Sequence, residues 1–255
     1  GIYGADTKDL HLQSIFKKVD FSKIKTYRQF FKAARKAKGT EKFTSVSFKE
    51  GMQELIEALQ NHLKDEIIVG KMITELPANS IICTDAHQAA ELLRSSHPQI
   101  AQRLNQITYL PISAATIITT HQVKDLTKSF GCLFSPRTYS SHIRGILANY
   151  EIFPEQCKEG HLHSYTFIMG TDQSLEISLE NELRDLGLHE VWKQKVEVLT
   201  KAWTRGLPLY NTERFHLVEQ IRSENLDNMA IFGNYIGGIS LREIFNSAKE
   251  TVEDL

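Results

Sequence analysis

The sequence predicts a fold that mixes α/β and α+β arrangements. Segments of strand length, rich in β-branched and aromatic residues, are scattered along the middle of the chain. Apolar stripes with helical period lie before and after them, and no internal repeat occurs. The 255 residues are 41% hydrophobic and 24% charged. A chain of this length buries roughly 70–75% of its unfolded surface, so it needs no disulfide or metal to hold a core.

The amino-terminal part of the chain is strongly basic. Residues 8–49 contain twelve lysines and arginines and three acidic residues, a net charge of +9 that leaves −10 for the rest and −1 in total. Apolar residues recur there at three- and four-residue steps, namely Phe16, Val19, Phe21, Ile24, Tyr27, Phe30 and Phe31. This pattern predicts a basic amphipathic helix, suited to lipid headgroups, a polycarboxylate ligand or nucleic acid. A solvated lysine-rich face packed on the core is the alternative, and the nearly neutral total argues against a general nucleic-acid binder.

The other elements are predicted in chain order. Ser47 and Glu50 have capping-box spacing and an apolar stripe follows, so a helix is expected over 51–63. Short strands are expected over 67–69 and 80–83. The later elements are a helix over 86–94, strands over 112–120, 130–134, 143–147 and 162–169, a helix over 174–186, strands over 195–203 and 229–232, and a helix from 241.

The segment 232–243 carries the sharpest local signal. Ser240 and Glu243 have capping-box spacing, so Ser240 is the expected N-cap of the last helix. Glycines in the preceding loop allow a ligand to approach the backbone, and the helix start adds about half a unit of positive charge. Together they predict a strand–loop–helix that receives an anion. A glycine-rich turn with only a structural role is the alternative.

Four further segments carry motif-like patterns. They are Gly1-Ile2-Tyr3-Gly4-Ala5-Asp6, Phe48-Lys49-Glu50-Gly51-Met52, Ser129-Phe130-Gly131-Cys132-Leu133, and Trp203 with Pro208 and Tyr210. Together with 232–243, they resemble the flavin-dependent protoporphyrinogen/coproporphyrinogen oxidases of the amine-oxidase-like flavoprotein superfamily. That family begins with a strand and a G-x-G-x-x-G turn that holds the FAD pyrophosphate, and no such turn occurs here. The resemblance implies a central and carboxy-terminal part of such an enzyme, without its amino-terminal FAD segment.

The resemblance implies a porphyrinogen oxidase of haem biosynthesis. Such an enzyme uses FAD and dioxygen to oxidise protoporphyrinogen IX or coproporphyrinogen III to the porphyrin in three two-electron steps, with release of hydrogen peroxide. The chain by itself is expected to be inactive, and the full-length protein to be cytoplasmic or peripheral on the inner face of a membrane. The alternatives are another amine-oxidase-like flavoenzyme and a non-catalytic fragment that acts as a binding module.

The resemblance also divides the chain by function. Residues 1–46 are expected to form a basic helical lobe on the membrane or substrate side. Residues 47–85 and 205–255 would be parts of a split, Rossmann-type FAD domain, and residues 86–204 a substrate-binding domain with a mixed sheet.

Site residues follow from the same resemblance. For FAD it implies the Ile73 backbone at the adenine and Trp203 as a wall of the flavin. It also implies three residues beside the pyrimidine end of the isoalloxazine, Ile239, Ser240 and Leu241, and two that pass near the cofactor, Gly233 and Asn234. For the porphyrinogen it implies Phe130 stacked on a pyrrole ring, the Gly131 carbonyl facing pyrrole N–H groups, and two residues that sandwich the macrocycle, Leu133 and Leu147. A mostly apolar tetrapyrrole with acidic side chains suits an apolar slot with peripheral cations. No catalytic side chain is implied, and strand, core or turn packing is the structural alternative for each residue.

The cysteines and histidines indicate no metal site. Cys83, Cys132 and Cys157 are odd in number and lack C-x-x-C spacing, which is typical of a reducing compartment. His161 and His163 could share one face of a strand, but no third ligand is near them in the sequence. An exposed strand edge is the favoured interpretation.

Overall fold

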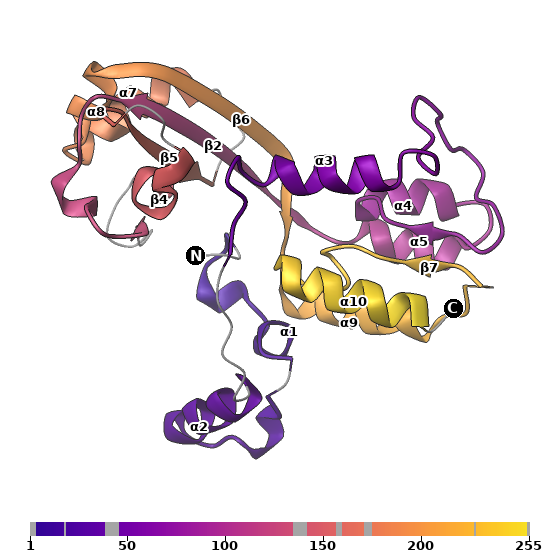
Figure 1. The fold of residues 1–255 in the computed structure, drawn as a ribbon. Coiled ribbons are helices and arrows are strands. Elements are labelled where there is room, and N and C mark those ends of the chain that lie inside the picture. The colour runs from indigo at the N-terminus through magenta and orange to yellow at the C-terminus, as the bar shows by residue number, and fades with distance from the viewer. Residues whose placement is uncertain are drawn as a thin grey trace. The chain divides into compact units, whose positions relative to one another are not determined.

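The computed structural model describes residues 4–17, 19–38, 46–134, 142–156, 160–170, 175–226 and 228–253. The chain forms two compact units, drawn in Figure 1. The sheet unit contains Gly1–Gly4, Thr44–Val69 and Leu110–Leu207, and the helical unit contains Ala5–Phe43, Gly70–Tyr109 and Pro208–Leu255. These units show which residues pack together and not what each part binds, so the functional division expected from the sequence stays a prediction. The motif residues 1–3 and Cys157 lie outside the described residues.

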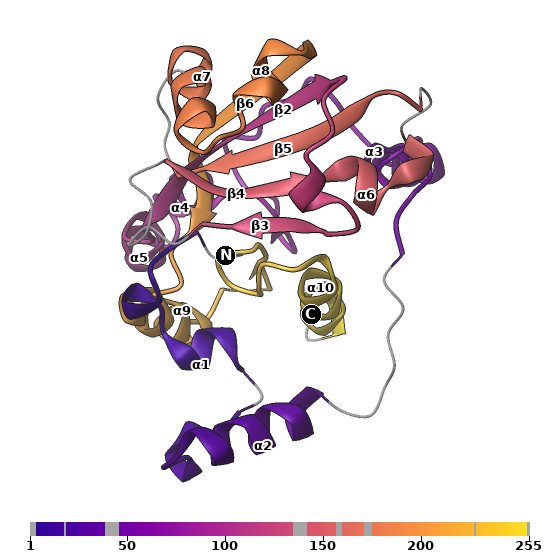
Figure 2. The ribbon, with the colours of Figure 1, turned by 90° about the vertical axis from the view of Figure 1, so that its left-hand side faces the viewer.

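The sheet unit is built on a five-stranded sheet. Its strands are β2 (Tyr109–Thr119), β3 (Gly131–Leu133), β4 (Ile143–Ala148), β5 (His163–Met169) and β6 (Lys195–Pro208), in the order β3-β4-β5-β2-β6. Figure 2 shows this sheet face-on. The pairs β3/β4, β4/β5 and β5/β2 are antiparallel. The five strands predicted between residues 112 and 203 are confirmed, and β6 is longer than expected because it runs on to Pro208.

One face of this sheet is covered by helices. Strand alternation sends every second side chain of β2 and β5 to that face. There the side chains of the sheet pack against α7 (Leu175–Asp185) and α8 (His189–Lys193). The core residues include Ala115, Ile117, Ile143, Ile146, Tyr165, Phe167, Met169, Leu179, Leu183 and Val191. The opposite face of the sheet carries the candidate site.

The segment before the sheet departs from the sequence prediction at two places. Helix α3 (Gln53–His62) forms as expected, but it begins after Gly51, whose φ of 98° is left-handed, and Ser47 does not cap it. Instead the Glu54 carboxylate accepts from the N–H of Glu50. The strand predicted over 67–69 is wrong, because no described strand pairs with it. The shorter elements of this unit are η3 (Lys124–Leu126), α6 (Asn149–Ile152) and η4 (Pro154–Gln156).

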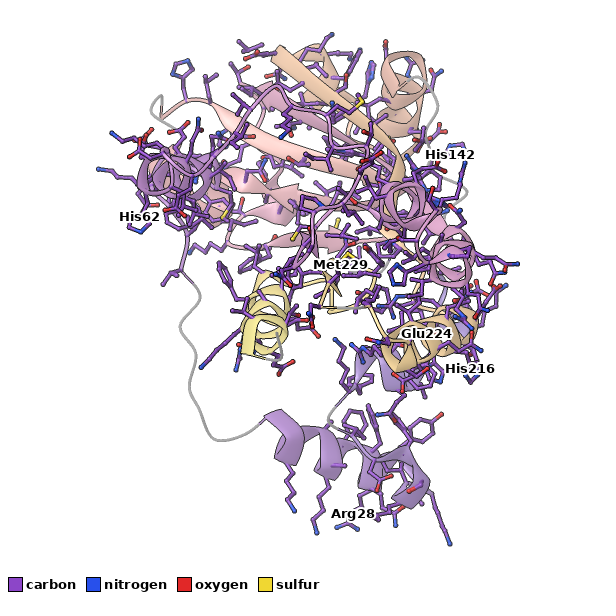
Figure 3. All side chains as sticks on the ribbon, turned by 90° about the vertical axis from the view of Figure 1, so that its right-hand side faces the viewer. Arg28, His62, His142, His216, Glu224 and Met229 are labelled. Carbon is purple, nitrogen blue, oxygen red and sulfur yellow. The ribbon has the colours of Figure 1, made fainter. Side chains whose placement is uncertain are left out.

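The helical unit packs around a two-stranded parallel sheet. Strand β1 (Ile81–Ile82) pairs with β7 (Ala230–Ile231), far away in the sequence. Around them lie α4 (Ala86–Leu93), α5 (Pro98–Asn105), α9 (Thr212–Ser223) and α10 (Leu241–Glu253). Glu224, the C-cap residue that follows α9 and is labelled in Figure 3, pairs with Arg103 of α5 at 2.6 Å. Because Arg214 is buried within α9, the helix lacks a clean apolar stripe, and it was not expected from the sequence.

The basic amino-terminal stretch forms several short helices where the sequence predicts an amphipathic one. They are η1 (Thr7–Asp9), α1 (Leu12–Ile15), η2 (Phe21–Lys23) and the longer α2 (Tyr27–Lys38). Their aromatic side chains pack on one another, with Phe16 and Phe30 ring centroids 5.1 Å apart. The Asp20 carboxylate accepts from the N–H of Ser22 and starts η2. Apolar contacts therefore exist within this stretch, as its periodicity predicts.

Candidate functional site

A pocket of about 530 Å³ lies on the open face of the five-stranded sheet. All its lining residues belong to the sheet unit. Its larger lining side chains are apolar apart from one arginine, namely Ile112, Leu133, Arg144, Leu147, Ile168 and Trp203. Its volume and mostly apolar walls are typical of small-molecule sites.

The same alternation that builds the core builds this pocket. Leu147 pairs with Thr166, whereas their neighbours Ile146 and Phe167 pair on the core face. The Thr166 hydroxyl is held by Thr116 at 2.7 Å and by the Asn149 side-chain amide at 2.8 Å. The pocket face is therefore apolar, with one fixed hydroxyl in its wall.

Large apolar side chains are left open to solvent on this face. Leu133 is 72% exposed, Leu147 39% and Trp203 44%. Contiguous apolar surface of this kind marks a binding site more often than a stable exterior. The structure thus brings together both leucines predicted to sandwich the substrate. It places Trp203, predicted to wall the flavin, in the lining of the same pocket.

The two other predicted substrate residues lie beside the pocket and not among its lining residues. Phe130 is 76% exposed immediately before β3. Gly131 has a φ of 134°, and a Cβ there would overlap the Ile146 carbonyl oxygen and lie 2.8 Å from its carbon. Gly131 is therefore required for the pairing of β3 with β4, whatever its carbonyl binds. The ligand roles of both residues stay predictions.

Arg144 is the charged side chain of the pocket, and sequence reasoning missed it. It lies at a β-bulge in β4: Ile143 pairs with Met169 and Gly145 with Ile168, so no β5 residue stands opposite Arg144. Ile143 is in the core while Gly145 lines the pocket, which strict alternation would not allow. The extra residue puts Arg144 on the pocket face. A sequence carries no signal for a bulge of this kind.

A buried carboxylate holds the start of β4 next to the bulge. Glu182 of α7, 9% exposed, accepts from the N–H groups of His142 at 2.9 Å and Ile143 at 3.2 Å. Its other oxygen lies 2.6 Å from His142 Nδ1, and Figure 3 labels His142. Such charge-assisted hydrogen bonds are about twice as strong as neutral ones. They fix the backbone from which Arg144 projects.

The second predicted site is the loop between β7 and α10 in the helical unit. Ser240 Oγ accepts from the N–H of Glu243 at 3.2 Å, and Glu243 Oε2 accepts from the N–H of Ser240 at 3.2 Å. The predicted capping box is confirmed. Lys17 lies 3.8 Å from Glu243 and offsets part of its charge. The helix start keeps its positive end, with Leu241 52% exposed beside it.

Side chains of the same unit hold this loop in place. Arg222 donates to the Ile236 carbonyl at 3.2 Å, Lys17 donates to the Gly237 carbonyl, and the Tyr210 hydroxyl donates to the Asn234 carbonyl. Burial lowers the pKa of Lys17. The loop is therefore rigidly anchored on one side.

The loop glycines are also needed for packing. A Cβ at Gly233 would lie 2.6 Å from the ring of Tyr235, and one at Gly237 would lie 2.8 Å from Ser247 Oγ. Tyr235 is completely buried, and burial raises the pKa of its hydroxyl. These contacts support a structural role for Gly233 and Gly237, while their predicted role in letting a ligand approach the backbone stays a prediction.

An isoalloxazine fits the chemistry of this loop. The exposed positive end of a 13-residue helix, with the apolar side chains of Ile239 and Leu241 beside it, suits a flat ring whose reduced form is anionic. Ile73 lies in an irregular segment of the same unit and is 42% exposed. Its predicted adenine contact stays a prediction, as do the cofactor contacts of Gly233 and Asn234.

The histidines and cysteines of the described residues gather into no metal site. His163 packs against Tyr150, and burial lowers its pKa. Burial raises the pKa of the Cys132 thiol, which is unfavourable for a nucleophile. Among the described helices, none is long and apolar enough to cross a membrane.

Comparison with known proteins bears directly on the predicted resemblance. Protoporphyrinogen oxidase 1 from the chloroplast of Arabidopsis thaliana is 22% identical over 311 aligned positions, which cover 98% of this chain. The chain is similar to protoporphyrinogen oxidases. It spans 57% of that relative's length, and no protein-family model matches it. The resemblance inferred from five short segments is therefore confirmed.

Solved structures agree on the fold. A candidate protoporphyrinogen oxidase from Exiguobacterium superposes with a TM-score of 0.75 at 17% identity, over all of this chain and 61% of that one. Reduced UDP-galactopyranose mutase gives a TM-score of 0.54 at 10% identity, over 68% of this chain and 40% of that one. An oxidoreductase from Methanosarcina mazei gives 0.54 at 13%, over 80% and 54%. The predicted mixed α/β fold class is confirmed.

Proposed function

We propose that the protein containing this chain is an FAD-dependent oxidoreductase of the amine-oxidase-like class, and specifically a porphyrinogen oxidase. The carrying observation is similarity to a protoporphyrinogen oxidase along 98% of the chain. The apolar pocket supports it, because both leucines predicted to sandwich the substrate line that pocket. The substrate is protoporphyrinogen IX or coproporphyrinogen III. Three two-electron oxidations give the porphyrin, while three dioxygen molecules are reduced to three hydrogen peroxide molecules.

Residues of the chain bind and orient the reactants. Leu133, Leu147 and Trp203 supply apolar surface for a tetrapyrrole, and about 530 Å³ is within the usual size of ligand pockets. The start of α10 offers N–H groups where the reduced cofactor gathers negative charge. Bound FAD would accept hydride from a meso carbon and pass the electrons to dioxygen. No side chain has to act as a general base, because the substrate releases a proton to solvent after each loss of hydride, and two of the three protons lost overall come from pyrrole N–H groups.

Contact with an anionic membrane surface belongs to the same proposal. The aromatic-basic surface of the helical unit consists of Leu12, Tyr27 and Phe31 together with four exposed cations of α2, namely Arg28, Lys32, Arg35 and Lys36. Tyr27 is 87% exposed and Phe31 59%. Exposed rings next to cations are typical of interfacial helices. This arrangement favours lipid over the alternatives left open by the sequence.

Expression of the complete gene tests the function. We expect a yellow protein with flavin absorbance, and red porphyrin fluorescence when a porphyrinogen is added in air. A yellow protein that gives no fluorescence above the spontaneous rate would favour another flavoenzyme of the same class. A colourless protein that binds porphyrin would favour the non-catalytic binding module.

A further inference from the structure

We propose that Arg144 is a carboxylate-binding residue of the sheet-unit pocket, which selects an apolar ligand bearing an acidic side chain. The guanidinium lies among apolar walls formed by Leu133, Leu147 and Ile168. The β-bulge between Ile143 and Gly145 turns Arg144 to the pocket face of the sheet, where its side chain is half-buried. For the substrate class, the inference rests on the proposed function; for the carboxylate site itself, it does not.

No acidic side chain among the described residues pairs with Arg144. The nearby carboxylate of Glu182 is directed to the backbone of His142 and Ile143. A cation in an apolar wall loses hydration, and this loss is offset only by an anion or by hydrogen bonds. Elsewhere in the described chain, arginines such as Arg103 and Arg184 have carboxylate partners. Within the described residues this charge has no acidic partner, and a ligand carboxylate in the pocket would supply one.

The surroundings of Arg144 leave room for a planar partner. The side chain lies over Gly170, where a Cβ would be 3.0 Å from Arg144 Nε. A glycine at that position leaves the guanidinium edge uncrowded for a two-oxygen acceptor, the partner that its fork geometry suits best. Met169, beside Gly170, also lines the pocket and keeps this end of it apolar.

The spacing along β4 defines the shape of the ligand. Arg144 and Leu147 are three residues apart, or about 10 Å at roughly 3.3 Å per residue. A ligand with a broad apolar body at Leu147 and a carboxylate on a short flexible arm would satisfy both ends. In the proposed reaction, a propionate arm of the porphyrinogen has this chemistry.

The test compares acid and neutral probes on the complete protein and its variants. 1-Pyrenebutyrate and 1-pyrenebutanol share an apolar body and differ only in the carboxylate. We expect the wild type to bind the acid about 10-fold or more tightly than the alcohol by pyrene fluorescence. In Arg144→Met this preference should disappear while alcohol binding is unchanged, and Arg144→Lys should keep part of it. The control Arg184→Met, on α7, should behave as wild type.

The outcomes separate this inference from the proposed function. If the wild type prefers the acid and Arg144→Met abolishes the preference, the carboxylate site stands even where no porphyrinogen is oxidised. Equal binding of acid and alcohol by the wild type, or a preference that survives in Arg144→Met, overturns it even where oxidation is observed. Protoporphyrin IX and its dimethyl ester provide the matching pair for the proposed substrate. Arg144→Met should lower affinity for the free acid alone.

Discussion

Replacing Gly131 by alanine tests whether this residue is required by the sheet or only by a ligand. Its φ of 134° is one that L side chains rarely adopt. The new Cβ would overlap the Ile146 carbonyl oxygen, 2.8 Å from the carbonyl carbon and 3.0 Å from Leu147 Cα. These are backbone atoms of β4, which cannot rotate away. The alanine therefore has to push β3 and β4 apart.

The cost follows from that separation. Ordinary carbon–carbon contact is about 3.5 Å, so the strands have to move by at least ~0.7 Å. The hydrogen bonds from Ala148 N to Phe130 O and from Phe134 N to Arg144 O, both 3.0 Å, then weaken or break. Two ladder bonds at about 1 kcal/mol each and backbone strain of about 1–2 kcal/mol give a loss of about 3–4 kcal/mol.

Thermal unfolding followed by circular dichroism measures this loss. For a protein of this size, about 3 kcal/mol lowers Tm by roughly 6–12 °C. Gly160→Ala is the control, because a Cβ at Gly160 meets nothing within 4 Å. If Gly131→Ala melts within 2 °C of the control, the steric argument is wrong. Gly131 would then matter only to a ligand.

Three other perturbations follow from particular contacts. Glu182→Ala should cost about 3 kcal/mol in urea unfolding, because it removes the acceptor of one buried and one part-buried N–H group and the partner of the His142 imidazole. Glu180→Ala, which removes only a partly exposed ion pair of α7, should cost under about 0.5 kcal/mol, and equal costs would contradict this. Burial lowers the pKa of His163 in the folded state below its ordinary value of 6.5. As pH falls below ~6.5, the unfolded state therefore binds a proton before the folded state does, and the free energy of unfolding decreases. His163→Asn should flatten that decline, and an unchanged pH profile would refute the assignment. The double variant Tyr27→Ser/Phe31→Ser should co-sediment several-fold less with anionic vesicles, and 0.5 M salt should have the same effect on the wild type. Neutral vesicles should bind neither protein. Undiminished binding of the variant to anionic vesicles would exclude the aromatic-basic surface as the membrane contact.

Local patterns predicted most of the elements that carry the candidate sites. Strands β2 and β5 follow from alternation, because one face of each is buried and the other is not. The Ser240 capping box depends on side chains three residues apart, so it needs no tertiary information. The strand expected over 67–69 failed for the converse reason: apolar β-branched residues form a strand only where a partner strand accepts their hydrogen bonds.

The candidate site was predicted in part. The resemblance placed Leu133 and Leu147 at one ligand, and they line one pocket. It assigned Trp203 to the cofactor, although Trp203 lines that same pocket. The resemblance compares residues one at a time, whereas a pocket is formed by neighbouring strands that are distant in sequence.

The sequence by itself determined the fold class, most of the elements and the resemblance to protoporphyrinogen oxidases, because each depends on short-range pattern and residue type. Only the tertiary structure decided that Arg144 faces the pocket. Its direction depends on one unpaired residue between Ile143 and Gly145, set by the register with β5 and by the Glu182 carboxylate from α7. A shift of one residue turns a side chain from the core to the opposite face, and that choice is made by the neighbouring strand and helix, not by the segment itself.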